Sequence, residues 1–281
     1  MPLPGATRFA LAPGYHMSRR WRSDCPCYLA PLALYGLAPK MNKTSRSRLL
    51  VLAVLTILPS FLKRPLYRLF FGYKIGKRVR IGLSLVDARD CTIEDDVQIG
   101  HLNVITRVEK LTIRDHVRIG HLNIIRGGAA VSLGRYCEII RMNEINSIPD
   151  PEVVNEIDPV FLLGDGSIVT TGHKIDFTDR VEIGRRVILG GRNSSLWTHN
   201  RQRTMPITIG PMVYIGSEIR MAPGSAVPAR SIVGIGSVIT AQLTEEGKLI
   251  AGVPAKTVKE LSSEDQFLIE RKTRPDLPDD V

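Results

Sequence analysis

Cysteine, aromatic side chains and membrane-spanning apolar runs are all scarce in this sequence of 281 residues. Four cysteines without a framework spacing argue against a secreted protein stabilised by disulfides. The apolar stretch from Leu49 to Leu62 has 14 residues, whereas a helix needs about 20 to cross a bilayer. We therefore expect a cytoplasmic protein with one elongated domain and short appendages.

Acidic residues are missing from Cys25 to Val86, a region that contains eleven Lys or Arg. The apolar stretch lies inside this region, and a basic helical segment is expected over residues 41–72. A short apolar segment flanked by basic residues is typical of a helix that lies on an anionic membrane surface. We therefore expect residues 43–80 to make peripheral contact with the inner face of the membrane. A helix packed on the rest of the protein or on a neighbouring subunit is the alternative. No nucleic-acid-binding motif or basic-aromatic groove is present, so nucleic acid is not an expected partner.

The first forty residues are rich in Pro, Ala and Leu and have no periodicity. They precede Met41, which opens the sequence MNKTSRSRLL. Residues 1–40 are therefore expected to be a disordered leader or an over-extended gene start. Ser18-Arg19-Arg20 is similar to a twin-arginine signal, but Asp24 and Pro26 interrupt the apolar stretch that should follow. Export is not expected.

A six-residue repeat runs without a break from Ile209 to Thr240. A helix would repeat apolar residues every three or four positions and a strand every two. A period of six instead predicts a hexapeptide β-helix, in which three short strands and three turns form each coil. The aliphatic residues of the repeat are Ile209, Ile215, Met221, Val227, Val233 and Ile239.

The repeat extends upstream with interruptions, and the β-helix is predicted over residues 73–240. Residues 92–105 and 112–125 match at ten of fourteen positions with an offset of twenty, which indicates one coil plus a small bulge. Cys91 and Cys137 both occupy an inward slot and are predicted to fill the core. His101 and His121 share one position of the repeat, so they should stack on a turn.

The C-terminal region, residues 241–281, predicts a turn, a short helix and a tail. Residues 257–273 alternate apolar and charged side chains at helical spacing, and Pro275 prevents continuation. Ser262 followed by Asp265 is typical of a helix N-cap. We expect this helix to cap the open end of the stack.

Reactive residues are expected where the repeat is interrupted, near residues 141–162 and 194–206. The segment from Ser194 to Pro206 contains His199, and the preceding coil contains His173 and Asp176. Histidine is a natural general base near neutral pH. Asp176 is the nearest carboxylate in sequence that could fix its tautomer. We expect the two interruptions to be adjacent along the stack, because neighbouring strands lie about 4.8 Å apart.

The sequence resembles the hexapeptide-repeat acyltransferases, in particular O-acetyltransferases of the maltose, galactoside and exopolysaccharide type. The resemblance covers about residues 70–260 and is most specific from Gly190 to Lys259, through GGRNSSLWTH, the unbroken repeat and AGVPAKTVK. It implies an all-β, left-handed parallel β-helix, a homotrimer with active sites between subunits, and acetyl-CoA as co-substrate without a permanently bound cofactor or metal. The family's Thr-His element falls on Thr198-His199, which makes His199 the general base.

The resemblance also implies the residues that contact the co-substrate. The aromatic residue before Ile-Gly falls on Tyr214, and the other positions fall on Ser217, Ile235, Thr240 and Lys256. Ile235 departs from the usual alanine and is expected to narrow the pantetheine channel. The acceptor residues of the simple sugar acetyltransferases have no clear match, so a hydroxyl of a cell-surface polysaccharide or its precursor is the expected carbohydrate acceptor.

Alternative functions remain open in the sequence. An acyltransferase with another acceptor, such as serine or an amino-sugar nitrogen, would use the same fold. His116 and His121 have the spacing of the zinc site in γ-class carbonic anhydrases, but their phase in the repeat differs, and an exposed histidine ladder is the simpler interpretation. A scaffold without catalytic activity would share the repeat but would not bind CoA.

Overall fold

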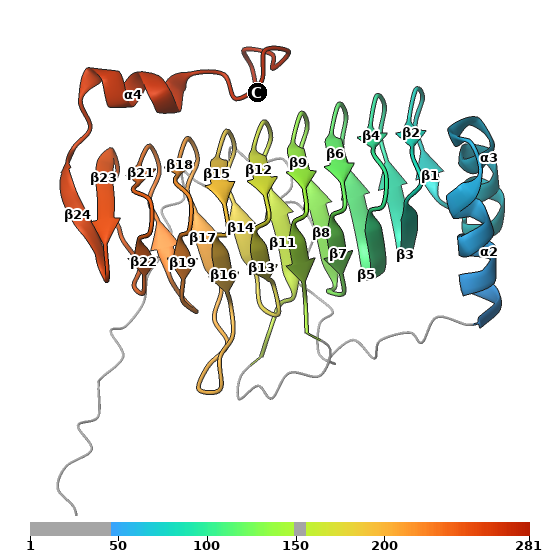
Figure 1. Ribbon diagram of the computed structural model, residues 1–281, viewed down its shortest axis with the longest axis horizontal. Helices are drawn as coiled ribbons and strands as arrows, with labels where there is room; N and C mark the ends of the chain where they lie inside the picture. Colours follow the sequence, from blue (N-terminus) through green and yellow to red (C-terminus); the bar gives the residue numbers. More distant parts are fainter. Residues whose placement is uncertain (1–45, 149–155) are drawn as a thin grey trace, which may run out of the picture. The chain divides into compact units, whose positions relative to one another are not determined.

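The repeat folds into a parallel β-solenoid, which confirms the predicted architecture (Figure 1). A computed structural model describes residues 46–148 and 156–281. The leader expected over residues 1–40 lies outside this range. Within the described residues, two sheets form the walls of the stack, and almost all neighbouring strands in them are parallel.

The larger sheet has 14 strands in two rows that meet at β5. One row contains the strand with Ile209 and its equivalents in the other coils, and the other row contains the strand with Met221 and its equivalents. The strands of the sheet are β1 (Lys74–Ile75), β3 (Leu85–Ile93), β5 (Val104–Ile113), β7 (Ile124–Arg126), β8 (Ala130–Leu133), β10 (Glu144–Asn146), β11 (Val160–Leu163), β13 (Lys174–Asp176), β14 (Val181–Ile183), β16 (Ser195–Trp197), β17 (Ile207–Ile209), β19 (Arg220–Met221), β20 (Ala226–Val227) and β22 (Val238–Ile239).

The smaller sheet has ten strands, and each coil contributes one of them until the final antiparallel pair. They are β2 (Arg80–Ile81), β4 (Gln98–Ile99), β6 (Arg118–His121), β9 (Glu138–Arg141), β12 (Ile168–Thr171), β15 (Ile188–Arg192), β18 (Tyr214–Ile215), β21 (Ile232–Val233), β23 (Lys248–Gly252) and β24 (Ala255–Glu260).

The core is a column of aliphatic side chains stacked in register. In the smaller sheet Ile99 pairs with Ile119 and Ile215 pairs with Val233, and all four side chains are buried. The same arrangement in each coil removes one apolar side chain per hexad from water, so each coil is stabilised by its neighbours. Cys91 and Cys137 are buried free thiols in this column, as predicted. Burial raises the pKa of each to about 12.

Two series of turn residues adopt positive φ in coil after coil. An L-residue in this conformation costs roughly 1–2 kcal/mol, so the strain recurs along the stack and is offset by the inter-coil bonds that the turns permit. Glycine takes the position in some coils, at Gly166 in one series and at Gly172 and Gly236 in the other. The non-glycine members are Arg78, Asp96, His116, Tyr136, Arg186, Met212 and Arg230 in the first series, and Leu102, Leu122, Met142, Asn193 and Glu218 in the second.

Two helices, α2 (Arg46–Ile57) and α3 (Ser60–Phe71), pack on the first coil. The apolar run predicted as one segment is therefore broken, and Pro59 is the N-cap of α3. Leu52, Leu55 and Tyr67 are buried in the common core. These contacts support the packing alternative for this part of the chain.

Basic side chains of α3 bond the backbone carbonyls at the open edge of the first coil. Lys63 Nζ donates to the carbonyls of Gly82 and of Thr56, the latter at 2.8 Å. Arg64 donates to Gly76 O at 3.1 Å, and Arg68 donates to the carbonyl of Ile75. Carbonyls at a sheet edge need such partners when they are shielded from water. These bases therefore terminate the stack.

The solenoid continues past the boundary expected at residue 240. β23 pairs in parallel with β21 through Ile232–Leu249 and Val233–Ile250, because its aliphatic residues resume the inward positions. β24 then pairs antiparallel with β23 and covers the last edge. Helical structure was expected from residue 257, but residues 257–260 belong to this strand.

The C-terminal helix α4 (Ser263–Glu270) begins at Ser262 with a capping box to Asp265, as predicted. It does not cap the end of the stack. Figure 1 shows α4 and the tail after it running back along the turns of the solenoid. Arg186 bonds the carbonyl of Glu270, and Arg274, 3% exposed, donates to His116 O and Tyr136 O, both at 3.0 Å. The turn carbonyls of His116 and Tyr136 and the side chain of Arg186 therefore hold the tail on the side of the stack.

The two expected loops are shorter than predicted. β10 and β11 narrow the first to residues 147–159, of which 149–155 are outside the described range. β16 lies within the second, which leaves residues 198–206 outside the regular strands. Ile183 pairs with Ile209 and Ile209 pairs with Val227, so the coil that carries His199 has 26 residues and the next has 18.

Candidate functional site

His199 and Asp176 form the most direct acid-base pair in the described solenoid. His199 Nδ1 lies 2.6 Å from Asp176 Oδ2. β13 ends at Asp176 and β16 ends at Trp197, and these two residues are register partners in adjacent coils. The chain then turns away from the wall at Thr198, which places the imidazole beside the carboxylate. The two interruptions of the repeat are therefore adjacent along the stack, as predicted.

The Asp176 carboxylate is surrounded by hydrogen-bond donors. Oδ2 accepts from Thr198 N at 3.1 Å, from Thr198 Oγ1 at 3.0 Å and from His199 N at 3.2 Å. Oδ1 accepts from Thr178 N at 3.1 Å and from Thr178 Oγ1 at 2.6 Å. Both carboxylate oxygens therefore act as acceptors in these bonds. With Oδ2 as the acceptor of the 2.6 Å contact, His199 carries its proton on Nδ1, which leaves the lone pair on Nε2.

The loop from Thr198 to Met205 presents His199 to solvent. His199 and Thr204 form an isolated antiparallel bridge, and Met205 N donates to Thr198 O at 2.8 Å. The tip is closed by Asn200, whose Oδ1 accepts from Gln202 N and from Arg203 N. Thr198 is fully buried, whereas the His199 side chain is 24% exposed. The backbone is therefore fixed at the base of the loop while the imidazole remains accessible.

His173 belongs to a buried polar ladder that runs along the stack. Asn123 N donates to Asn103 Oδ1 at 3.0 Å, and Asn143 N donates to Asn123 Oδ1 at 3.0 Å. His173 N then donates to Asn143 Oδ1 at 2.9 Å, and Ser194 N donates to His173 Nδ1 at 3.1 Å. Each side chain accepts from the backbone one coil further on, so the ladder fixes the spacing of the coils.

The His173 ring is fully buried and both of its nitrogens are occupied. Nε2 lies 2.9 Å from Thr170 Oγ1, whose hydroxyl is directed at backbone carbonyls. His173 Nδ1 accepts a hydrogen bond from the backbone, so Nε2 carries the ring proton. Burial lowers the pKa of His173 to about 4, which keeps the ring neutral. The structure thus places His173 in the buried turn that leads into β13, away from the exposed His199 side chain.

Three of the residues expected to contact the co-substrate lie along one edge of the stack. Ser217 and Ile235 occupy the turns after β18 and β21, and Gly236 N donates to Ser217 O at 3.0 Å. Lys256 pairs with Ala251 in the final hairpin, next to the same turn position. Ile235 is 72% exposed and Lys256 is also exposed. This edge is therefore accessible from outside.

Tyr214 and Thr240 lie elsewhere in the coil. Tyr214 points outward from the smaller sheet and is 37% exposed. Thr240 follows β22, in the row that also contains β16, so it lies at the turn used by His199 two coils earlier. One wall of the solenoid therefore separates the turn with His199 from the turn with Ser217 and Ile235. A single chain does not bring the two groups to one point.

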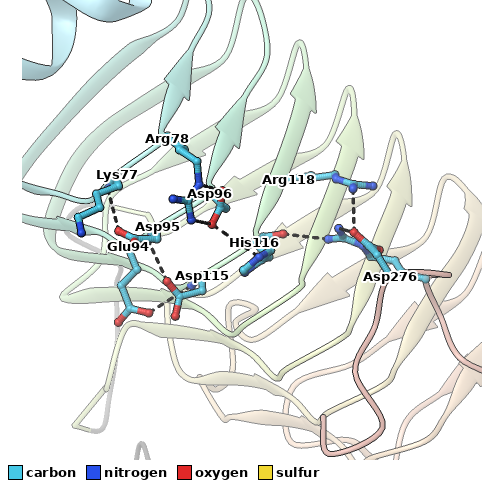
Figure 2. Close-up of polar contacts among 10 residues, drawn as sticks. Lys77, Arg78, Glu94, Asp95, Asp96, Asp115, His116, Arg118 and Asp276 are labelled. Carbon is cyan, nitrogen blue, oxygen red and sulfur yellow. Dashed lines mark hydrogen bonds and ion pairs between the residues drawn. The ribbon is translucent and has the colours of Figure 1, made fainter.

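The other histidines form stacks on the turns. The rings of His101 and His121 are 5.5 Å apart at an interplanar angle of 4°, which confirms the predicted ladder. His116 stacks on Tyr136 at 4.5 Å, and its Nε2 lies 3.7 Å from Asp96 (Figure 2). His116 and His121 thus belong to different stacks. Among the described residues, no group of three or more His, Cys, Asp or Glu side chains is arranged to hold a metal ion.

The sequence analysis named Thr198 only as part of the Thr-His element, and it did not single out Thr178, the asparagine ladder or Trp197. Trp197 is 43% exposed beside the pair of Asp176 and His199. The ladder had a signal in the sequence, because Asn103, Asn123 and Asn143 recur every twenty residues. Thr178 had none, since its role depends on the turn that follows β13.

Comparison with known proteins gives partial sequence matches. Galactoside O-acetyltransferase of Escherichia coli is 27% identical over 120 residues, which are 43% of this chain and 50% of that protein. The acetyltransferase-like protein YJL218W of Saccharomyces cerevisiae is 28% identical over 106 residues, 38% of this chain and 45% of that protein. The chain thus spans about half the length of the curated relatives it matches.

No model of a known protein family matches the sequence. Among solved structures, a hexapeptide-repeat acetyltransferase of Vibrio cholerae in complex with acetyl-CoA is 14% identical. The match covers 79% of this chain and 93% of that chain, with a TM-score of 0.34.

Proposed function

Because the chain belongs to the hexapeptide-repeat acetyltransferase family, we propose that it transfers an acetyl group from acetyl-CoA to a hydroxyl of a carbohydrate. The observation that carries the proposal is the pair formed by His199 and Asp176, with Nδ1 held at 2.6 Å and Nε2 directed away from the carboxylate. The galactoside O-acetyltransferase match supports an oxygen acceptor on a sugar. The sequence has no clear match to the acceptor residues of the simple sugar acetyltransferases. The proposed acceptor is therefore a cell-surface polysaccharide or its precursor.

His199 is the proposed general base. Nε2 takes the proton of the acceptor hydroxyl as the oxygen attacks the thioester carbonyl carbon, and a C–O bond forms. The tetrahedral intermediate collapses with cleavage of the C–S bond, and the proton on Nε2 passes to the departing sulfur. The products are the acetyl ester and free CoA. General-base catalysis of this kind contributes roughly 10²–10⁴ in rate.

Asp176 and His173 act as positioning residues in this proposal. Asp176 holds the imidazole in the tautomer with a free Nε2 and stabilises the imidazolium that forms during transfer. His173 holds Ser194, the residue before β16, and so fixes the strand that leads to Thr198 and His199. Backbone N–H groups beside the thioester are the proposed stabilisers of the oxyanion.

The active site is proposed to form between subunits of a homotrimer. Ser217, Ile235 and Lys256 lie on one edge of the solenoid and His199 lies on another, with a full wall between them. A second copy that brings its edge to His199 would complete the site. Lys256 then meets a CoA phosphate as a point charge, Tyr214 flanks the acceptor or the thioester, and Thr240 lies near His199 in the cleft.

The test is an assay of free thiol released from acetyl-CoA in the presence of different acceptors. Sugars, nucleotide-sugars, oligosaccharides and serine are supplied separately, and the product is analysed by mass spectrometry. Acetyl transfer to a sugar oxygen is the expected result. Transfer only to serine or to an amino-sugar nitrogen would contradict the acceptor, and CoA that neither binds nor reacts with any acceptor would contradict the enzyme.

A further inference from the structure

The two N-terminal helices expose a row of apolar side chains on the side away from the solenoid. On α2, Leu50, Val54 and Ile57 recur at helical spacing and are 70%, 57% and 73% exposed. On α3, Leu69 and Phe70 are 75% and 60% exposed. The opposite sides of both helices are buried on the first coil. The exposed row is thus separate from the contacts that terminate the stack.

The surroundings of this row are basic. No residue from 46 to 86 is acidic, and Asp87, the first carboxylate, is buried and bonded to Arg48. The segment that carries the exposed apolar side chains therefore contributes positive charge only, and the carboxylates nearest to its Arg68, those of Glu94, Asp95 and Asp115, belong to the coils. It therefore attracts an anionic partner.

A pocket of about 580 Å³ lies between the start of α3 and the turns of the first coils, and several arginines line it. Phe61, 71% exposed, lies at this pocket together with Arg64 and Arg80. Figure 2 shows two more arginines on the same turns, Arg78 paired with Asp96 and Arg118 paired with Asp276. Even with these pairs, arginines outnumber carboxylates in the lining. The apolar side chain of Phe61 thus lies beside a positively charged pocket, an arrangement that suits a lipid, whose acyl chain is apolar and whose headgroup phosphate is negatively charged.

We propose that α2 and α3 lie on the surface of a membrane that contains anionic phospholipids. The apolar side chains of the row enter the boundary between headgroups and acyl chains, and Arg80 and its neighbours contact the phosphates. Each helix has 12 residues and is about 18 Å long, too short to span a bilayer. In the part of the chain that is described, no helix meets the requirements for crossing a membrane.

Charge favours lipid over a second copy of the chain as the partner of this face. Two copies meeting through α2 and α3 would place one acid-free basic surface against another. Repulsion between like charges opposes such a contact. An anionic bilayer instead offers both the apolar layer and the opposite charge.

The test is sedimentation of the full chain with lipid vesicles of two compositions. One contains phosphatidylcholine alone, and the other contains phosphatidylcholine with phosphatidylglycerol. We expect binding to the anionic vesicles that weakens as salt is raised. The double substitution L69S/F70S should lower the vesicle affinity at least about tenfold, because it removes two apolar side chains from the boundary. Thermal melting checks that the variant is folded.

A matched control is available on α4, where Phe267 and Leu268 are 65% and 52% exposed. F267S/L268S should bind the vesicles as the unmodified chain does. For the charge, R80E should lower affinity for the anionic vesicles, whereas R185E, which changes another exposed arginine, should not. Equal binding by both members of either pair would overturn the proposal. A second result would also overturn it. In that result the chain does not bind the vesicles, and light scattering shows that it forms an assembly that the L69S/F70S substitution dissociates.

Discussion

Asp176 and His199 are 23 positions apart in the chain and are joined by a hydrogen bond of 2.6 Å between adjacent coils. The stack makes this contact possible, because β13 and β16 are register partners through Asp176 and Trp197. The pair therefore depends on the alignment of two coils of different length. A change in either residue, or in the ladder behind them, has consequences that can be measured.

Replacing Asp176 with asparagine should slow catalysis more than it weakens binding. The amide cannot accept all the hydrogen bonds that the carboxylate receives, and it no longer fixes the tautomer of His199. We expect kcat to fall about ten- to a hundredfold, with little change in KM for acetyl-CoA. Steady-state kinetics of thiol release gives both constants.

Asp179→Asn is the control for this change. Asp179 is also buried, at 6% exposure, and burial raises the pKa of its carboxyl, but it bonds Asp158 and Arg180 and does not contact His199. Its substitution should affect stability without the loss in kcat. An equal loss of kcat in both variants would contradict the role of Asp176 in positioning His199.

His173 should make the stability of the protein dependent on pH. Burial lowers its pKa to about 4 in the folded chain, from an ordinary value of 6.5, so the unfolded chain binds more protons between these values. The free energy of unfolding therefore falls as pH decreases through 6.5, by about 2 kcal/mol from this residue at about pH 5. Urea unfolding at about pH 7.5 and pH 5 measures the difference.

His173→Asn tests both the stability effect and the catalytic role. Asparagine is the residue of the three preceding rungs, so the ladder can continue through Oδ1. The variant should lose the part of the pH dependence that His173 causes and should keep acetyl transfer within about tenfold. A loss of transfer as large as that expected for His199 would show that His173 takes part in the chemistry.

The ladder should be costly to interrupt at its centre. Asn123 is fully buried and bonds Asn103 and Asn143 on either side. Asn123→Leu leaves the backbone N–H and the side-chain amide of Asn143 without their acceptor, and each such group costs about 1–3 kcal/mol. Ser225→Ala is the matched control, because Ser225 is buried but its hydroxyl has no hydrogen-bond partner among the described residues. Denaturant unfolding should show a large loss for the first variant and almost none for the second.

Lys63 should be important for the stability of the first coil. Burial lowers the pKa of its ammonium group, which donates to Gly82 O and Thr56 O. Lys63→Met keeps the apolar part of the side chain but leaves these carbonyls without the donor, at a cost of about 2 kcal/mol. Lys74→Met, at an exposed lysine of the same region, should cost less than about 0.5 kcal/mol. Equal melting temperatures for the two variants would contradict the role of Lys63.

The regular parts of the fold could be predicted because one six-residue pattern specifies strand, turn and core at once. The inward positions of Cys91 and Cys137 and the N-cap at Ser262 follow from that pattern and from local chemistry. The proximity of Asp176 to His199 also followed, since both lie at interruptions in neighbouring coils.

Features that depend on pairing between coils could not be predicted in the same way. Ser194 to Pro206 looked irregular as a whole, but the partner strand β13 keeps Ser195 to Trp197 in register. His173 looked like a second reactive histidine at an interruption, because its place in the buried ladder depends on Asn143 in a coil 30 residues earlier. The path of the tail depends on turn carbonyls that Arg274 reaches across more than a hundred residues.

The most direct test of the central claim is the rate of thiol release by His199→Ala with saturating acetyl-CoA and the best acceptor. We expect a loss of at least about a hundredfold, because the general base is removed. His121→Ala, a change in the exposed histidine stack, should retain the rate of the unmodified chain. Turnover by His199→Ala equal to that of His121→Ala would contradict His199 as the base.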